Sequence, residues 1–83
     1  MEKLSDLPNI GPELEQKLIE IGITSRAELI NAGTENVFIR IKALDTSACI
    51  NKLYAIEGAI QGLRWHGIDK GRKEELKHFI NEM

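Results

Sequence analysis

Residues 7–23 read LPNIGPELEQKLIEIGI, and this stretch decides how the chain begins to fold. Two apolar segments flank a short polar turn, Pro8-Asn9-Ile10-Gly11-Pro12. Proline is favoured at the first position of a helix, because its missing N–H would have no partner there, and glycine commonly ends a helix. The stretch therefore predicts a tight hairpin over about residues 3–23. A short helix precedes the turn, and a second helix runs from Pro12 to Ile21 and stops at Gly22.

Start and stop signals for helices recur through the middle of the chain. Ser25 and Glu28 form a capping box, in which the serine side chain reaches forward and the glutamate side chain reaches back. They open a helix over about residues 26–32, which Gly33 ends. Thr34 can cap the next helix, over about residues 35–44. The VFIRI segment inside it has the propensity of a strand, but the cap before it and the lack of a partner strand favour a helix.

The longest predicted helix covers about residues 47–63. Its apolar stripe steps by four, three, four and three residues: Cys49, Leu53, Ile56, Ile60 and Leu63. A second face holds only small residues: Ala55, Gly58, Ala59 and Gly62. Because glycine inside a helix costs about 1 kcal/mol relative to alanine, the two glycines predict that another backbone passes close to this face.

The segment after Asp69 predicts a closing helix, over about residues 70–82. Asp69 can cap its first turn, and three apolar side chains face inward: Leu76, Phe79 and Ile80. Together these patterns predict an all-α fold, a compact bundle of five to six short helices in a single domain (1–83). The bundle contains a helix-hairpin-helix-like motif, which packs against the 47–63 helix.

Composition limits the class of protein. The 83 residues are 42% apolar, and no apolar run approaches the roughly 18 residues that a membrane-spanning helix needs. The single cysteine, Cys49, lies on the apolar stripe, so we expect a small buried side chain rather than a nucleophile. One cysteine and two distant histidines, His66 and His78, do not form a metal site, and we expect both histidines at the surface. No carboxylate pair, triad or nucleotide-binding loop indicates catalysis. We therefore expect a cytoplasmic, non-enzymatic protein without a cofactor, a metal, a membrane contact or a small-molecule substrate.

The net charge of −2 is unevenly distributed. Residues 1–36 hold seven acidic and three basic side chains, whereas residues 37–83 hold six acidic and eight basic ones. The hairpin therefore lies in the acidic half of the chain.

The hairpin turn allows two interpretations. In DNA-binding hairpins, a Gly-hydrophobic-Gly turn presents backbone N–H groups to a phosphate, and Ile10 suits the hydrophobic position. Glu13 and Glu15, however, compete with a phosphate for the positive end of the helix dipole. The turn is thus either a packing hairpin or a weak phosphate-binding site. The residues that could contact phosphate here are Asn9, Gly11 and Lys17.

The basic residues of the closing helix also allow two interpretations, a phosphate-binding face or an ordinary surface. Four of them could form a phosphate-binding face: Lys70, Arg72, Lys73 and Lys77. Glu74 and Glu75 interrupt this face, so an ordinary solvated helix surface is the competing interpretation.

Aromatic residues mark a further candidate surface. Trp65, between Arg64 and His66, could form a stacking patch or a partner surface, or could anchor the junction between two helices. Tyr54 lies between the two faces of the 47–63 helix, and aromatic residues at such borders are favoured in interface cores. We therefore predict a homodimer or a docking surface for a partner, unless other helices of the chain cover these faces. Its residues are Tyr54, Gly58, Gly62 and Trp65.

The order of motifs along the chain resembles the C-terminal domain of the TfoX/Sxy family. The resemblance covers about Leu4 to Ile80. Besides the hairpin, four segments carry it: Phe38-Ile39-Arg40-Ile41-Lys42, Leu53-Tyr54-Ala55-Ile56-Glu57-Gly58-Ala59, Arg64-Trp65-His66 and Arg72-Lys73-Glu74-Glu75-Leu76.

This resemblance implies a non-enzymatic regulatory or interaction module that acts through contacts with a protein or with a second copy of itself. The alternative is a weak DNA binder without sequence specificity, which uses the hairpin and the basic C-terminal face. Proteins of the family are associated with bacterial competence for DNA uptake. The best-known members carry another domain ahead of this one, and because these residues do not include it, we expect a competence role to transfer poorly.

Overall fold

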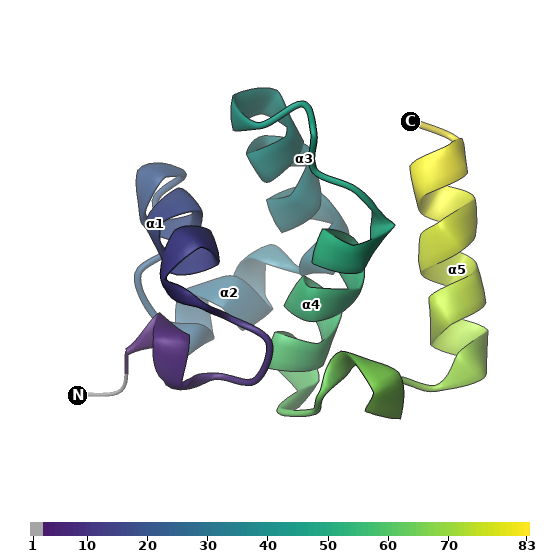
Figure 1. Ribbon diagram of the computed structural model, residues 1–83, viewed down its shortest axis with the longest axis horizontal. Coiled ribbons are helices and arrows are strands. Elements are labelled where there is room, and N and C mark those ends of the chain that lie inside the picture. Colours follow the sequence, from purple (N-terminus) through teal and green to yellow (C-terminus); the bar gives the residue numbers. More distant parts are fainter. Residues whose placement is uncertain (1–2) are drawn as a thin grey trace.

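The helices predicted from local signals are present in the computed structural model, which describes residues 3–83 (Figure 1). The α-helices are α1 (Pro12–Glu20), α2 (Arg26–Ala32), α3 (Thr34–Leu44), α4 (Ile50–Gln61) and α5 (Lys70–Asn81). Two short 3-10 helices complete the chain, η1 (Leu4–Asp6) and η2 (Trp65–Gly67). Residues 3–83 contain no strand, which confirms the all-α class and the helical assignment of the VFIRI segment.

Local capping holds the starts of α2 and α5 as predicted. The hydroxyl oxygen of Ser25 accepts a hydrogen bond from the N–H of Glu28 at 3.2 Å. The Glu28 carboxylate reaches back one residue further than expected, and accepts from the N–H and the hydroxyl of Thr24. At α5, the Asp69 carboxylate accepts from the N–H of Gly71 at 2.9 Å. Each contact satisfies a backbone donor or anchors the chain at the point where a helix begins.

The prediction that Thr34 caps α3 is wrong. Thr34 is the first helical residue, and Gly33 precedes it with a positive φ of 84°. The Thr34 hydroxyl instead donates to the buried carboxylate of Glu57 on α4, at 2.7 Å. The Thr34 side chain, which the local sequence pattern assigned to capping α3, therefore bonds a residue 23 positions away along the chain.

Helix α4 is shorter than predicted at both ends. The 45–48 segment is held as a turn, because Lys42 donates to the carbonyl oxygens of Thr46 and Ala48, at 2.6 and 2.7 Å. Cys49 therefore precedes the helix and is exposed, so its predicted place in the buried stripe is wrong. Leu63 at the other end lies beyond the helix and is 40% exposed.

Helix α4 is the centre of the domain, with the hairpin and α5 on opposite sides of it (Figure 1). It also packs against α2, α3 and η2. The largest fully buried side chains come from five helices: Leu18, Leu29, Val37, Phe38, Ile41, Leu53, Ile56 and Leu76. As predicted, Leu76 of α5 is buried, and Phe79 and Ile80 are partly buried against the same core. In the described part of the chain, no helix has both the length and the apolarity needed to cross a bilayer.

Candidate interaction surface

The side chain of Asn9 fastens the hairpin turn to the end of α4. Its amide nitrogen donates to the carbonyl oxygens of Leu63, at 2.9 Å, and Ala55, at 3.5 Å. Its amide oxygen accepts from the N–H of Trp65 at 3.1 Å. Asn9 has a φ of 69°, the left-handed conformation that asparagine tolerates better than most residues. Asn9, which replaces the glycine usual in such turns, therefore tethers the turn to the end of α4. Its side-chain amide already has hydrogen-bond partners within the domain.

Gly58 makes this tether sterically possible. A Cβ at this position would lie 2.6 Å from the carbonyl oxygen of Leu63 and would also collide with the Asn9 amide nitrogen. The predicted close approach therefore occurs at Gly58, although the approaching groups are the hairpin side chain and the 63–65 backbone rather than another helix. At Gly62 the prediction is wrong, because this glycine has a φ of 76° and ends α4 in the left-handed conformation.

Three aromatic rings and one lysine meet where α4, η2 and α5 come together. The rings of Tyr54 and Trp65 are nearly parallel, with centroids 6.4 Å apart, and the His66 ring stacks on Trp65 at 4.6 Å. The Lys73 ammonium lies over both Trp65 and Tyr54, at 5.4 and 5.8 Å from the centroids. Both separations fall within the range of attractive stacking and cation–π contacts. We call these four residues, with the exposed Leu63 two positions before Trp65, the Trp65 surface.

The Trp65 surface is open to solvent. Trp65 is 42% exposed and Leu63 is 40% exposed, while Tyr54 is half-buried. Trp65 thus lies at a junction between helices, as one interpretation of the sequence held, without being covered by them. His66 and His78 are both exposed, which confirms that prediction. Tryptophan is among the residue types most enriched in binding hot spots, and Trp65 is held in place while its ring remains exposed.

Arg72, one of the predicted phosphate contacts, lies in an internal network. Its guanidinium forms two hydrogen bonds to Glu35 of α3, at 2.9 and 3.1 Å, and two to Glu57 of α4, also at 2.9 and 3.1 Å. Thr34 and Gln61 donate to the same Glu57 carboxylate. The side chain of Glu57 is only 8% exposed, so the network joins three helices around a buried charge.

The network also explains the acidity of its carboxyl groups. Burial opposes ionisation of Glu57, but hydrogen bonds from Arg72, Gln61 and Thr34 outweigh it and lower the pKa of that carboxyl. The hydrogen bonds from Arg72 likewise lower the pKa of Glu35. In return, Glu35 and then Glu57 raise the pKa of Arg72, which therefore stays charged. Sequence reasoning missed this network, although Glu57 is the single charged residue between Leu53 and Leu63.

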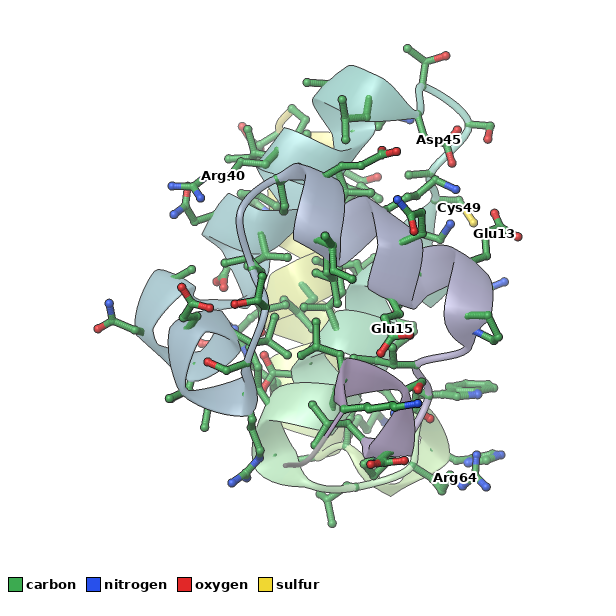
Figure 2. All side chains as sticks on the ribbon, turned by 90° about the vertical axis from the view of Figure 1, so that its left-hand side faces the viewer. Glu13, Glu15, Arg40, Asp45, Cys49 and Arg64 are labelled. Carbon is green, nitrogen blue, oxygen red and sulfur yellow. The ribbon has the colours of Figure 1, made fainter. Side chains whose placement is uncertain are left out.

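Lys17, another predicted phosphate contact, takes part in a ring of four charges. Its ammonium is 2.9 Å from a Glu13 oxygen and 3.6 Å from an Asp45 oxygen. Lys52 of α4 reaches the same two carboxylates, at 4.0 and 3.8 Å. Figure 2 shows Glu13 and Asp45 at one corner of the domain, with Cys49 beside them. The hydrogen bond from Lys17 lowers the pKa of Glu13, and the same bond raises the pKa of Lys17.

The remaining basic candidates are free of such pairing. Within residues 3–83, no carboxylate lies within 4.0 Å of the charged nitrogens of four residues: Arg64, Lys70, Lys73 and Lys77. Figure 2 shows Arg64 extending outward at the lower edge of the domain, far from Arg40 at the opposite corner. An open hollow separates Arg64 from the hairpin turn, and Gly11 lies on its wall. The structure thus brings Lys73 to the aromatic rings, places Arg64 at the hollow beside the hairpin turn, and leaves Lys17 and Arg72 in separate internal clusters.

Comparison with known proteins agrees with the motif order. The family model described as the TfoX C-terminal domain matches residues 1–80. The chain belongs to the TfoX C-terminal domain family. This confirms the resemblance drawn from the sequence.

Two relatives of known name share this TfoX C-terminal domain. The DNA transformation protein TfoX of Haemophilus influenzae is 30% identical over 83 residues, which are all of this chain and 38% of that protein. Protein Sxy of Escherichia coli is 29% identical over 82 residues, or 99% of this chain and 39% of that protein. The chain therefore spans less than two fifths of either relative, and both are considerably longer.

Two crystal structures from Listeria monocytogenes show the same TfoX C-terminal fold. An uncharacterized protein in a triclinic form is 52% identical with a TM-score of 0.92, over 94% of this chain and 89% of that one. A protein of unknown function in a tetragonal form is 51% identical with a TM-score of 0.90, over 94% of this chain and 96% of that one. In those crystals the fold is therefore present in chains of similar length.

Proposed function

We propose that this domain is a non-enzymatic regulatory module that binds a protein partner through the Trp65 surface. The observation that carries the proposal is the state of Trp65, which is 42% exposed and yet fixed. Its ring stacks on His66, and its backbone N–H is held by Asn9. A side chain that is already ordered loses little conformational entropy on binding, so its contact area contributes more fully to affinity.

The distribution of charge supports a protein partner over a DNA duplex. Glu13 and Glu15 are in the first turn of α1, where a phosphate would bind. The side chains of Asn9, Lys17 and Arg72 already have partners within the domain. Phosphate contacts dominate the affinity of most DNA-binding proteins, and a chain with a net charge of −2 provides few of them. Gly11, Lys70, Lys73 and Lys77 are the predicted phosphate contacts whose groups remain available.

The partner is either another protein or a second copy of this chain, and we place the module in the bacterial cytoplasm. A regulatory role is supported by membership of the family that includes TfoX and Sxy. A reducing compartment suits a sequence whose single cysteine has no possible disulfide partner within the chain. The competence role of the longer relatives is not part of this proposal.

Photo-crosslinking inside bacterial cells tests the proposal. Leu63, which lies two residues before Trp65 and is exposed, is replaced by the photoreactive residue p-benzoyl-L-phenylalanine. Irradiation is expected to attach a discrete protein to this position, and Trp65→Ala in the same chain is expected to remove most of that adduct. An adduct of twice the mass of the chain would identify a second copy as the partner.

A matched probe controls for non-specific capture. Ile39 is 49% exposed on α3 and is not part of the Trp65 surface, so the same photoreactive residue at position 39 should not capture the same protein. Absence of a protein adduct at position 63, or the same adducts at positions 63 and 39, would rule the proposed surface out.

A further inference from the structure

The positive charges of the domain are neutralised unevenly. Lys17, Lys52 and Arg72 each lie within 4.0 Å of two or more carboxylate groups. Within residues 3–83, by contrast, neither Lys73 of the Trp65 surface nor Arg64, which precedes Trp65 in the sequence, has a carboxylate that close to its charged nitrogens. Cations elsewhere, such as the exposed Arg40 of α3, also have no carboxylate within 4.0 Å in the described residues, but Lys73 is the one that lies over exposed aromatic rings.

Helix α5 extends this free positive charge beyond the rings. Lys70, Lys73 and Lys77 are spaced by three and four residues, which places them along one side of the helix. Lys73 lies over the rings of Tyr54 and Trp65, so this side of the helix borders the Trp65 surface. Glu74 is the acidic residue beside this row of lysines, and it is exposed.

We propose that the Trp65 surface recognises an acidic protein segment that carries a large apolar side chain. The inference rests on the proposed function, and names the chemistry of the partner. Trp65 and Leu63 offer the apolar contact, while Arg64, Lys73 and the row of lysines on α5 would pair with carboxylates around it. An apolar centre with a charged rim is the usual anatomy of a protein interface.

The charged rim decides which partners are accepted. Complementary rim charges speed association and disfavour wrong partners, because like charges brought together are costly. A basic segment would meet Lys73 and Arg64, and a neutral one would leave these cations without partners. A nucleic acid would add many phosphates against a domain of net charge −2.

Charge reversal combined with mapping of the captured segment tests this chemistry. The photoreactive residue stays at position 63, and the captured peptide is sequenced by mass spectrometry. Arg64→Glu with Lys73→Glu is expected to lower the adduct yield about tenfold or more, because two attractive contacts become repulsive. The mapped segment is expected to carry net negative charge and at least one large apolar residue. Arg40→Glu, a reversal of the same sign at an exposed arginine on the opposite corner, should leave the yield unchanged.

A second measurement does not depend on the folding of any variant. The chain with the photoreactive residue at position 63 and no charge reversal is crosslinked in a lysate of the same bacterial strain. The adduct yield should fall several-fold between about 50 mM and about 200 mM salt, because salt screens exposed charge pairs.

The outcomes separate this inference from the proposed function. A captured protein whose segment is neutral or basic, with a yield insensitive to charge reversal, would overturn the acidic partner and leave the protein-binding module standing. An adduct that nuclease removes would overturn both, as would the absence of any adduct.

Discussion

Replacing Arg72 with methionine is expected to reduce the free energy of unfolding by about 3 kcal/mol, the largest effect of any single surface-accessible side chain in this domain. Removing one partner of a buried ion pair typically costs 3–5 kcal/mol, because an uncompensated charge remains. Here that charge is Glu57, whose side chain is 8% exposed. Urea unfolding followed by circular dichroism measures the loss. The matched control is Lys70→Met on the same helix, whose ammonium has no carboxylate within 4.0 Å in the described residues and which should cost less than about 0.5 kcal/mol.

A double variant shows whether the loss comes from the pair itself. Glu57→Gln removes the stranded charge, so Arg72→Met together with Glu57→Gln should cost clearly less than the sum of the two single changes. Simple additivity would mean that Arg72 stabilises the domain by packing and not by neutralising Glu57.

The same network makes the stability of the domain depend on pH. The pKa values of Glu35 and Glu57 are lower in the folded chain than their ordinary value of about 4.3. Their contribution is therefore fully present above that ordinary value, and is lost as the pH falls through the lower folded values. In the Arg72→Met variant, Glu57 is buried without the guanidinium, and burial favours its neutral form. The contribution of Glu57 to stability should therefore increase, rather than decrease, as the pH falls. The stability difference between the two proteins should accordingly shrink from pH 7 toward pH 3, and a constant difference would contradict the network.

Gly58→Leu is expected to destabilise the domain by about 1–3 kcal/mol, because the side chain would overpack a filled space. Even its Cβ would lie 2.6 Å from the carbonyl oxygen of Leu63 and would collide with the Asn9 amide. The substitution should therefore also release the hairpin, seen as faster amide hydrogen exchange at the N–H of Trp65, which Asn9 now accepts. Gly67→Ala is the control, since its Cβ would lie at an ordinary 3.8 Å from the nearest atom.

Gly58→Ala sharpens this prediction. Alanine in the middle of a helix is favoured over glycine by about 1 kcal/mol, so an alanine in open space would stabilise α4. At position 58 we expect the collision to cancel or outweigh that gain. A raised melting temperature for Gly58→Ala, or an unchanged one for Gly58→Leu, would show that the space beside Gly58 is not filled.

The parts of the fold that sequence predicted are those that local chemistry decides. Pro12 begins α1, Gly33 ends α2 and Asp69 caps α5, and each of these signals acts within a few residues of its target. The apolar stripe of α4 was correct at its centre, where Leu53 and Ile56 are fully buried. It failed at Cys49, because the turn held by Lys42 displaces the start of the helix.

The parts that sequence could not predict depend on partners far along the chain. Thr34 suits a helix cap by its type, but it binds Glu57, 23 residues away, and Arg72 binds Glu35, 37 residues away. Nothing within a few residues of Arg72 distinguishes it from its neighbours Lys70 and Lys73, which have no carboxylate within 4.0 Å in the described residues. Glu57, the single charged residue between Leu53 and Leu63, was the one signal that a buried network required a cation.

Some features of the candidate surface could likewise be predicted from the sequence, and others could not. Tyr54 and Trp65 were identified from their place at the border of a long helix, and the structure brings the two rings together. Asn9 was a possible phosphate contact from its position in the turn, with a packing hairpin as the alternative. Its side chain tethers that turn, because Gly58 leaves a space that only the folded chain reveals. Lys73 joined the rings through packing of α5, which no local pattern encodes.

The central claim is that Trp65 serves binding and not folding, and one paired measurement on Trp65→Ala tests it. The crosslinking yield at position 63 and the free energy of unfolding are determined for the same variant. We predict that the captured protein is lost while the free energy of unfolding falls by clearly less than the roughly 3–5 kcal/mol that truncating a buried tryptophan costs. A variant that keeps its partner, or one that unfolds in proportion to the binding it loses, would show that Trp65 is a structural residue.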